Sequence, residues 1–139
     1  MIGASHPGRL LAARAAIAVL LAAHGAAHFL ALARLVRSIS LDLPVELFGG
    51  LVVTSSPAVG MVVALALAAA GTGFVAAGFM LGGREPRVGP LLVAVAALSL
   101  TMTVVGLWGM VGGVLVNLVV LALAPDVPRL VHPERVPVG

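Results

Sequence analysis

The chain has 139 residues, of which 61% are apolar and only 9% are charged, and its formal net charge is +3. A soluble domain carries about 25% charged residues, so this composition excludes a soluble globule, and its apolar content excludes an intrinsically disordered chain. Because the chain has no Cys, disulfides, thiolate metal sites, iron–sulfur clusters and disulfide–quinone chemistry are ruled out. We therefore expect an all-α, polytopic membrane protein with a single domain.

Four apolar runs are long enough, or nearly long enough, to cross a bilayer as helices, which takes about 20 residues. They predict a four-transmembrane-helix bundle in residues 1–124 and a Pro-rich tail in residues 125–139, which we expect to be extended and mobile. The expected helices cover about residues 9–33, 58–81, 88–107 and 109–124. The first run is longer than the apolar core of a secretory signal peptide and contains two His, so we expect it to be retained.

The segments between the runs also carry predictions. Residues 34–57 are too apolar to float freely in water, so we expect a short amphipathic helix or re-entrant piece on the bilayer surface. Ser55-Ser56-Pro57 then supplies capping chemistry for the next helix. Between the last two runs, the Gly-rich segment 106–113 predicts a tight helical hairpin with Trp108 at the membrane–water interface. The alternative is one long bent helix, which would overshoot the bilayer.

The Arg residues predict the topology. Six of them lie at ends that would face one side of the membrane: Arg9, Arg14, Arg84, Arg87, Arg129 and Arg135. The other side carries only Arg34 and Arg37, which two acidic residues offset. The positive-inside rule then places both termini in the cytoplasm. Because these Arg residues sit in pairs at the edges of apolar runs, we interpret them as interface anchors, and we expect no nucleic-acid partner.

Polar side chains inside the apolar runs mark a candidate site. His24 and His28 are four residues apart, so they lie on one face of a helix. At 1.5 Å per residue, this pair and Asn117 reach a common depth of roughly 8–14 Å below the outer surface, and two Thr fall in the same half. The sequence therefore predicts an interior polar cluster, whose members are His24, His28, Asn117 and one of Thr101 and Thr103.

Three interpretations of this cluster remain open: hydrogen bonds that fix helix register, a ligand or metal site, and a pH-sensitive or proton-handling site. A zincin is excluded, because Gly25 stands where HExxH places its Glu. A rhomboid-type protease is excluded as well, because Leu100 follows Ser99 where that motif needs Gly. Two His alone are an incomplete metal site, so no metal is assigned and the cofactor stays unknown.

Small residues at four-residue spacing allow close helix contacts in lipid. They are Ala23, Ala27 and Ala31 in the first run and Ala69, Gly73 and Ala77 in the second. Such stripes predict either a dimer face or ordinary packing inside the bundle.

Two short segments resemble a loose group of small four-helix bacterial membrane proteins that includes DoxX-like ones. One is His24-Gly25-Ala26-Ala27-His28, similar to an HGxxH stretch in the first helix of those proteins. The other is the Gly-x-x-x-Asn-Leu pattern of residues 113–118, which contains Asn117. The resemblance implies a four-helix bundle in the bacterial plasma membrane and links the two His with Asn117, without implying a settled activity.

Two classes of function follow as hypotheses. The first is a non-enzymatic subunit or accessory of a membrane assembly, whose partners are the lipid bilayer and either a second copy or a larger complex. The alternative is a DoxX-like redox or quinone-associated protein, or a metal or small-solute carrier, that uses His24 and His28. A cofactor and metal inventory would separate the two classes.

Overall fold

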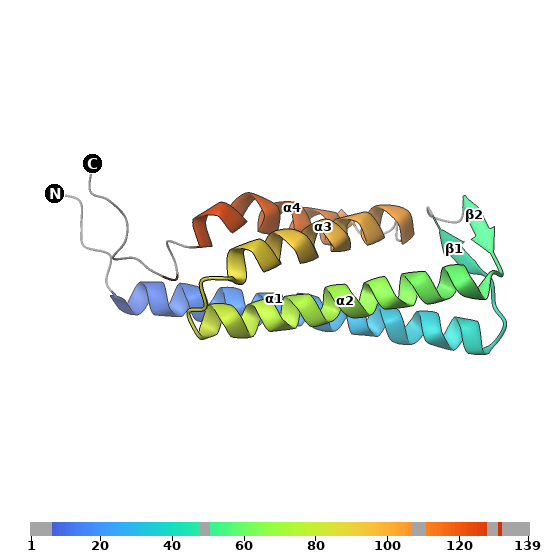
Figure 1. Cartoon of the computed structure of the whole chain (residues 1–139), viewed down its shortest axis with the longest axis horizontal. Helices are drawn as coiled ribbons and strands as arrows, with labels where there is room; N and C mark the ends of the chain where they lie inside the picture. The colour runs from blue at the N-terminus through green and yellow to red at the C-terminus, as the bar shows by residue number, and fades with distance from the viewer. Residues whose placement is uncertain (1–6, 48–50, 107–110, 128–130, 132–139) are drawn as a thin grey trace.

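Figure 1 shows the computed structural model of the chain, which describes residues 7–47, 51–106, 111–127 and 131. The described residues form four α-helices, which confirms the all-α class, together with one short two-stranded sheet. In chain order the elements are α1 (Pro7–Ser40), β1 (Val45–Leu47), β2 (Val52–Thr54), α2 (Pro57–Gly82), α3 (Val88–Gly106), α4 (Val111–Leu123) and the 3-10 turn η2 (Ala124–Asp126).

Three of these helices are long and apolar enough to cross a membrane: α1, α2 and α3. The shorter apolar helix that follows them covers Gly113–Asp126. By helix length and hydropathy the chain is therefore a multi-pass membrane protein. The hairpin predicted around Trp108 falls on residues 107–110, which lie outside the described residues.

The long helices α1 and α2 form an antiparallel pair, and α3 and α4 lie side by side along it (Figure 1). Glycines let the backbones of α1 and α2 approach closely. A Cβ atom added to Gly25 would lie 2.7 Å from the carbonyl oxygen of Gly71, and one added to Gly78 would lie 2.8 Å from that of Ala18. This contact requires glycine, because any side chain would overlap the facing backbone.

The two small-residue stripes are covered to different extents within the chain. In α2, Gly73 faces Val95 of α3 and Ala77 is fully buried, so these two residues pack inside the chain, whereas Ala69 is exposed. In α1, Ala23 and Ala27 are exposed on the outer surface of the helix. The glycines that meet α1 lie beside the α2 stripe rather than in it.

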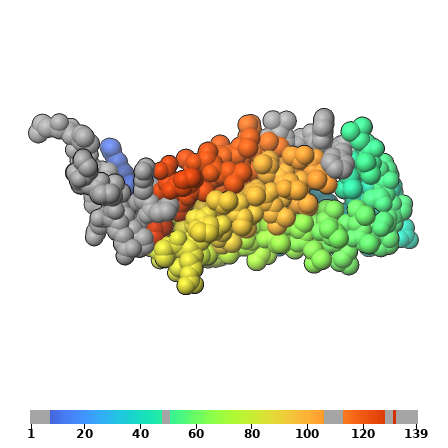
Figure 2. Space-filling model, turned by 45° about the horizontal axis from the view of Figure 1, so that its top comes forward, coloured from blue at the N-terminus to red at the C-terminus, as the bar shows by residue number. Residues whose placement is uncertain are grey.

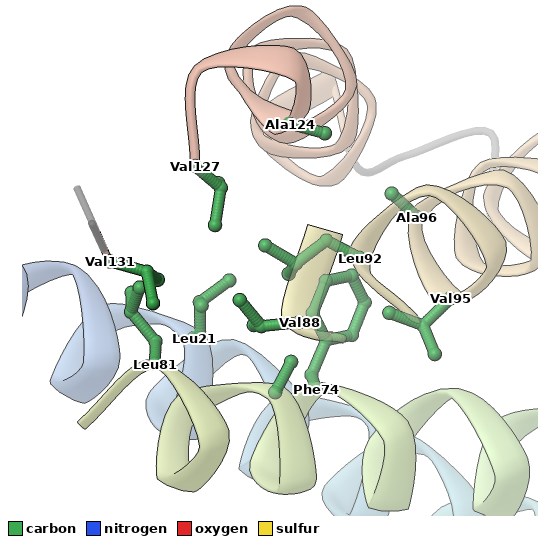
Figure 3. Close-up of a cluster of buried hydrophobic side chains, with 11 residues drawn as sticks. Leu21, Phe74, Leu81, Val88, Leu92, Val95, Ala96, Ala124, Val127 and Val131 are labelled. Atoms are coloured by element: carbon green, nitrogen blue, oxygen red, sulfur yellow. The ribbon is translucent and has the colours of Figure 1, made fainter. Parts of the chain in front are cut away.

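The apolar core lies between the start of α3, the second half of α2 and the end of α4 (Figure 3). Its buried members are Leu21, Phe74, Ala77, Leu81, Val88, Leu92, Val95, Ala96, Ala124, Val127 and Val131. The last three residues belong to the segment that follows α4. The prediction of an extended, mobile tail from residue 125 is therefore wrong for the described part of that segment, because η2 and two buried Val pack against the bundle.

Helix α1 and the segment after it differ from the sequence prediction. We expected this helix to end near residue 33, but it continues to Ser40, because nothing in residues 34–40 opposes a helix. The helix stops two residues before Asp42, whose backbone is left-handed (φ 53°). The segment that follows is a β-hairpin rather than a surface helix, with Val45 paired to Thr54 and Leu47 to Val52. β-Branched residues favour the extended backbone there.

The second helix begins as predicted, with Pro57 in its first turn. The capping residue Ser56 has an extended backbone, but its side chain makes no cap hydrogen bond. Instead, its backbone N–H donates to the Thr54 hydroxyl at 3.1 Å. The start of α2 is thus tied to the end of the hairpin.

Candidate functional site

Four polar side chains from three helices form one hydrogen-bonded group, which we name the His–Ser–Asn network: His24 and His28 of α1, Ser99 of α3 and Asn117 of α4. Nε2 of His28 lies 2.9 Å from Oγ of Ser99, and Nδ2 of Asn117 donates to the same Oγ at 2.8 Å. Nε2 of His24 lies 3.3 Å from Oδ1 of Asn117. Ser99 and Asn117 are fully buried, so the network joins α1, α3 and α4 in the protein interior.

One assignment of neutral imidazole tautomers satisfies every contact in the network. Asn117 uses its amide N–H to donate to Ser99, so the Ser99 hydroxyl is free to donate to Nε2 of His28. The other side of the amide, Oδ1, accepts from Nε2–H of His24. Within the described residues no buried side-chain nitrogen or oxygen lacks a partner, which is what a low-dielectric interior demands.

Helix α2 contributes an aromatic ring to the site through Phe74, which is fully buried. Its ring centroid lies 4.6 Å from that of His24 in an edge-to-face arrangement, and 5.8 Å from that of His28 with the two planes nearly parallel. The two imidazoles themselves are 5.1 Å apart. Both rings are thus held against one aromatic side chain, in geometries that aromatic pairs favour.

The local sequence explains why these rings converge. The four-residue spacing places both His on one face of α1, and Gly25 between them lets α1 approach α2 closely. That approach brings the imidazoles onto Phe74, three residues after Gly71. The glycine in the HGxxH stretch therefore has a packing role in this chain.

The sequence prediction brought together the two His and Asn117, and these three lie in the network. The predicted Thr does not: the Thr103 hydroxyl donates to the Ser99 carbonyl and the Thr101 hydroxyl to the Ala97 carbonyl, both within α3. Ser99 takes the place expected for a Thr. Helical periodicity could not have singled out Ser99, because apolar residues surround α3 on all sides; the structure shows that Ser99 lies on the same face as the buried Leu92 and Ala96.

The four Arg residues predicted as interface anchors lie near the start of α1 and in the turn between α2 and α3, at the same end of the molecule (Figure 1). Arg9, Arg84 and Arg87 are exposed, whereas Arg14 is largely covered by the chain, with 9% of its surface exposed. Arg84 has a left-handed backbone (φ 63°) in the turn between α2 and α3. The fifth predicted anchor, Trp108, lies outside the described residues.

Two hollows adjoin the network, one toward each end of the bundle. An apolar groove of about 340 Å³ lies between α1 and α4, where its walls include Leu21 and Val120. A cavity of about 500 Å³ lies at the hairpin end, where its walls include Ala31 and Met102. Each of these four residues is three residues from a member of the network, so about one helical turn separates the network from either hollow.

The chain shows no match to a family model, a curated protein or a solved structure. Function must therefore be argued from the side chains themselves. Among the described residues, no three His, Cys, Asp or Glu side chains come together as a metal site would require. The His–Ser–Asn network remains the densest group of polar side chains in the interior of the described structure.

Proposed function

We propose that the chain is a non-enzymatic, multi-pass protein of the bacterial plasma membrane that serves as a subunit or accessory of a larger membrane assembly. The observation that carries the proposal is the closure of the His–Ser–Asn network. Both Nε2 atoms, the Ser99 hydroxyl and the Asn117 amide are bonded to one another. Such a network holds helices in register, and its polar groups are already hydrogen-bonded to one another.

The Ser99–His28 contact resembles the arrangement of a nucleophile and its base, because the Ser hydroxyl lies 2.9 Å from an imidazole nitrogen. Two features argue against that role. Ser99 is fully buried, so a substrate has no approach to its Oγ. The same Oγ also accepts a hydrogen bond from Asn117, which lowers its nucleophilicity rather than raising it. The pair is better explained as a bond between α1 and α3.

The topology that we propose has four transmembrane helices and both termini in the cytoplasm. The start of α1 and the turn between α2 and α3 lie at the same end of the molecule (Figure 1), and this end carries Arg9, Arg84 and Arg87. Arg34 and Arg37 lie in the last turns of α1, at the hairpin end, where Arg34 lines the same cavity as Glu46. This distribution of Arg supports a cytoplasmic location for the first of the two ends.

The topology can be tested by thiol labelling, because the natural chain has no Cys and gives no background. Ser40→Cys places a thiol at the exposed end of α1, and Arg87→Cys places one at the opposite end. In intact cells a membrane-impermeant maleimide is expected to label Ser40→Cys, and to label Arg87→Cys only after permeabilisation. The reverse pattern would overturn the orientation.

A second candidate function is a DoxX-like redox or quinone-associated protein, or a metal or small-solute carrier, that uses His24 and His28 as ligands. The observation that favours it is the proximity of the two imidazoles, whose centroids are 5.1 Å apart. Using them as metal ligands through Nε2 would require both rings to leave Asn117 and Ser99. This candidate therefore predicts that ligand binding changes the packing of α1 against α3 and α4.

One experiment separates the two functions. The protein is extracted from its native membrane in mild detergent, and its metal content, absorption spectrum and organic extract are measured together with its size on a native gel. Migration with a larger complex and no stoichiometric ligand supports the accessory role. A metal, haem or quinone that is present in the natural protein and lost from His28→Ala would establish the second candidate instead. Thr101→Ala serves as the control, because Thr101 lies outside the network.

A further inference from the structure

The larger of the two hollows lies at the hairpin end of the molecule. There α1 and α2 continue beyond the end of α3 (Figure 1), and Figure 2 shows the teal β-hairpin lying over the far end of the green α2. The cavity between these elements has a volume of about 500 Å³, which is within the range of small-molecule sites, about 300–1,000 Å³. Residues from all of the surrounding elements line it, including Ala31, Arg34, Ser38, Glu46, Leu67 and Met102.

The chemistry of the wall changes from the inside of the cavity to its rim. The part nearest the network is apolar, with Ala31, Leu67 and Met102 on three different helices. The rim carries two charges on facing elements, Arg34 on α1 and Glu46 on β1. These two side chains, both in the described part of the chain, form no ion pair with each other. The rim therefore offers one site for an anion and another for a cation.

The position of the cavity along α1 matches the surface of a bilayer. The helix has 34 residues, which corresponds to about 50 Å, whereas the hydrocarbon core of a bilayer is about 30 Å thick. Arg34 is six residues beyond the buried His28, or about 9 Å along the axis. The charged rim thus lies where α1 leaves the hydrocarbon, and the apolar part of the cavity points back into it.

We propose that this cavity binds a single-chain amphiphile whose head group carries both a phosphate and an ammonium group. The phosphate is held by Arg34, whose guanidinium suits phosphate geometry. The ammonium is held by Glu46, and the acyl chain occupies the apolar part beside Leu67. A purely anionic head group would be repelled by the Glu46 carboxylate, and a purely cationic head group would be repelled by the Arg34 guanidinium. This site is separate from the accessory role proposed above and does not depend on it.

The first test measures where a lipid analogue binds. The full chain is placed in nanodiscs of phosphatidylglycerol and exposed to a lysophosphatidylcholine with a photoreactive group at the end of its chain. We expect labelling to concentrate on residues that line the cavity, at Leu67 and Met102. Labelling spread evenly over the exposed residues of α1 and α2 would overturn the proposal.

The second test fills the cavity. Ala31→Trp places a large side chain inside it, whereas Ala33→Trp adds the same side chain on the exposed face of α1. We expect the first variant to reduce labelling about tenfold and the second to leave it unchanged. Equal labelling of the two variants would contradict the proposal, provided that both give the helical spectrum of the natural protein.

The third test concerns the head group and begins with the natural chain, so that it does not depend on how a variant folds. Unlabelled lysophosphatidylcholine should displace the probe at about one-tenth of the concentration needed for lysophosphatidylglycerol or for an alkyltrimethylammonium of equal chain length. Equal competition by the anionic lipid would overturn the assignment of the two charges. Arg34→Gln and Glu46→Gln should each abolish this preference, whereas Arg37→Gln, outside the cavity wall, should retain it.

Discussion

Polar side chains are arranged in opposite ways in two regions of this molecule, the middle of the bundle and its hairpin end. Around Phe74 the helices meet through glycine and small side chains, and the buried polar groups are bonded to one another. At the hairpin end, Arg34 and Glu46 face a cavity without pairing to each other, both within the described residues. The comparison indicates that the first region stabilises the fold, whereas the second leaves its polar groups free for a ligand.

The largest loss of stability is expected from Gly25→Val. The added Cβ would lie 2.7 Å from the Gly71 carbonyl oxygen, so α1 and α2 would have to separate. We expect the free energy of unfolding in detergent to fall by about 3 kcal/mol. Ala26→Val is the matched control, because Ala26 is exposed. Similar melting temperatures for the two variants would show that this contact is not needed.

A smaller loss is expected from Asn117→Ala, which removes hydrogen bonds to both His24 and Ser99. We expect a decrease of about 2 kcal/mol in the free energy of unfolding, because two polar groups lose a partner in the protein interior. Thr101→Ala should have almost no effect, because its hydroxyl bonds only to a carbonyl of its own helix. Thermal unfolding followed by circular dichroism would measure both.

His28→Ala is expected to cost about 1–2 kcal/mol, through the loss of one hydrogen bond and one ring contact. A double-mutant cycle with Ser99→Ala isolates the contribution of the hydrogen bond. We expect a coupling energy of about 0.6–1.7 kcal/mol. A coupling energy of zero would mean that the 2.9 Å contact contributes nothing to stability, and the structural interpretation of the network would then fail.

The smallest effect is expected at the hairpin end, where Asp42 has a left-handed backbone. Asp42→Gly should raise the free energy of unfolding slightly, by about 0.5 kcal/mol, because glycine adopts this conformation without strain. Asp42→Val should lower it, since a β-branched side chain is disfavoured at positive φ. A loss as large as that of Gly25→Val would contradict the view that stability resides in the packed region.

Much of the fold could be predicted from the sequence because lipid imposes simple requirements. In lipid, a run of apolar residues such as 58–81 has to be helical so that its backbone N–H and C=O groups can bond to one another. The observed α2 begins and ends within one residue of this run. The end of α1 could not be predicted from bilayer thickness, because the helix continues beyond the length that a membrane needs. Its true end is set by the turn at Asp42, a local backbone effect.

The candidate site could be predicted in part for a similar reason. The depth of a residue in the membrane follows from counting residues along its helix. This count alone predicts that His24, His28 and Asn117 lie close together, and His24 and Asn117 are in contact in the structure. The rotation of α3 about its own axis could not be obtained by counting, because it depends on which side chains pack against α2. That rotation turns Ser99 inward and leaves Thr101 exposed. The cavity depends on the fold of the hairpin, for which the sequence predicted a surface helix or a re-entrant piece instead.

The lengths of the two paired helices have a consequence for the surrounding lipid. At 1.5 Å per residue, α2 with its 26 residues rises about 39 Å and α1 with its 34 residues about 50 Å, whereas the hydrocarbon core of a bilayer is about 30 Å thick. A helix longer than the hydrocarbon core tilts, kinks or thickens the bilayer around it, at a cost of a fraction of a kcal/mol per Å of mismatch. Because α1 and α2 pack backbone to backbone through their glycines, they would have to tilt together. The length of this pair would draw the protein toward the thicker regions of a membrane.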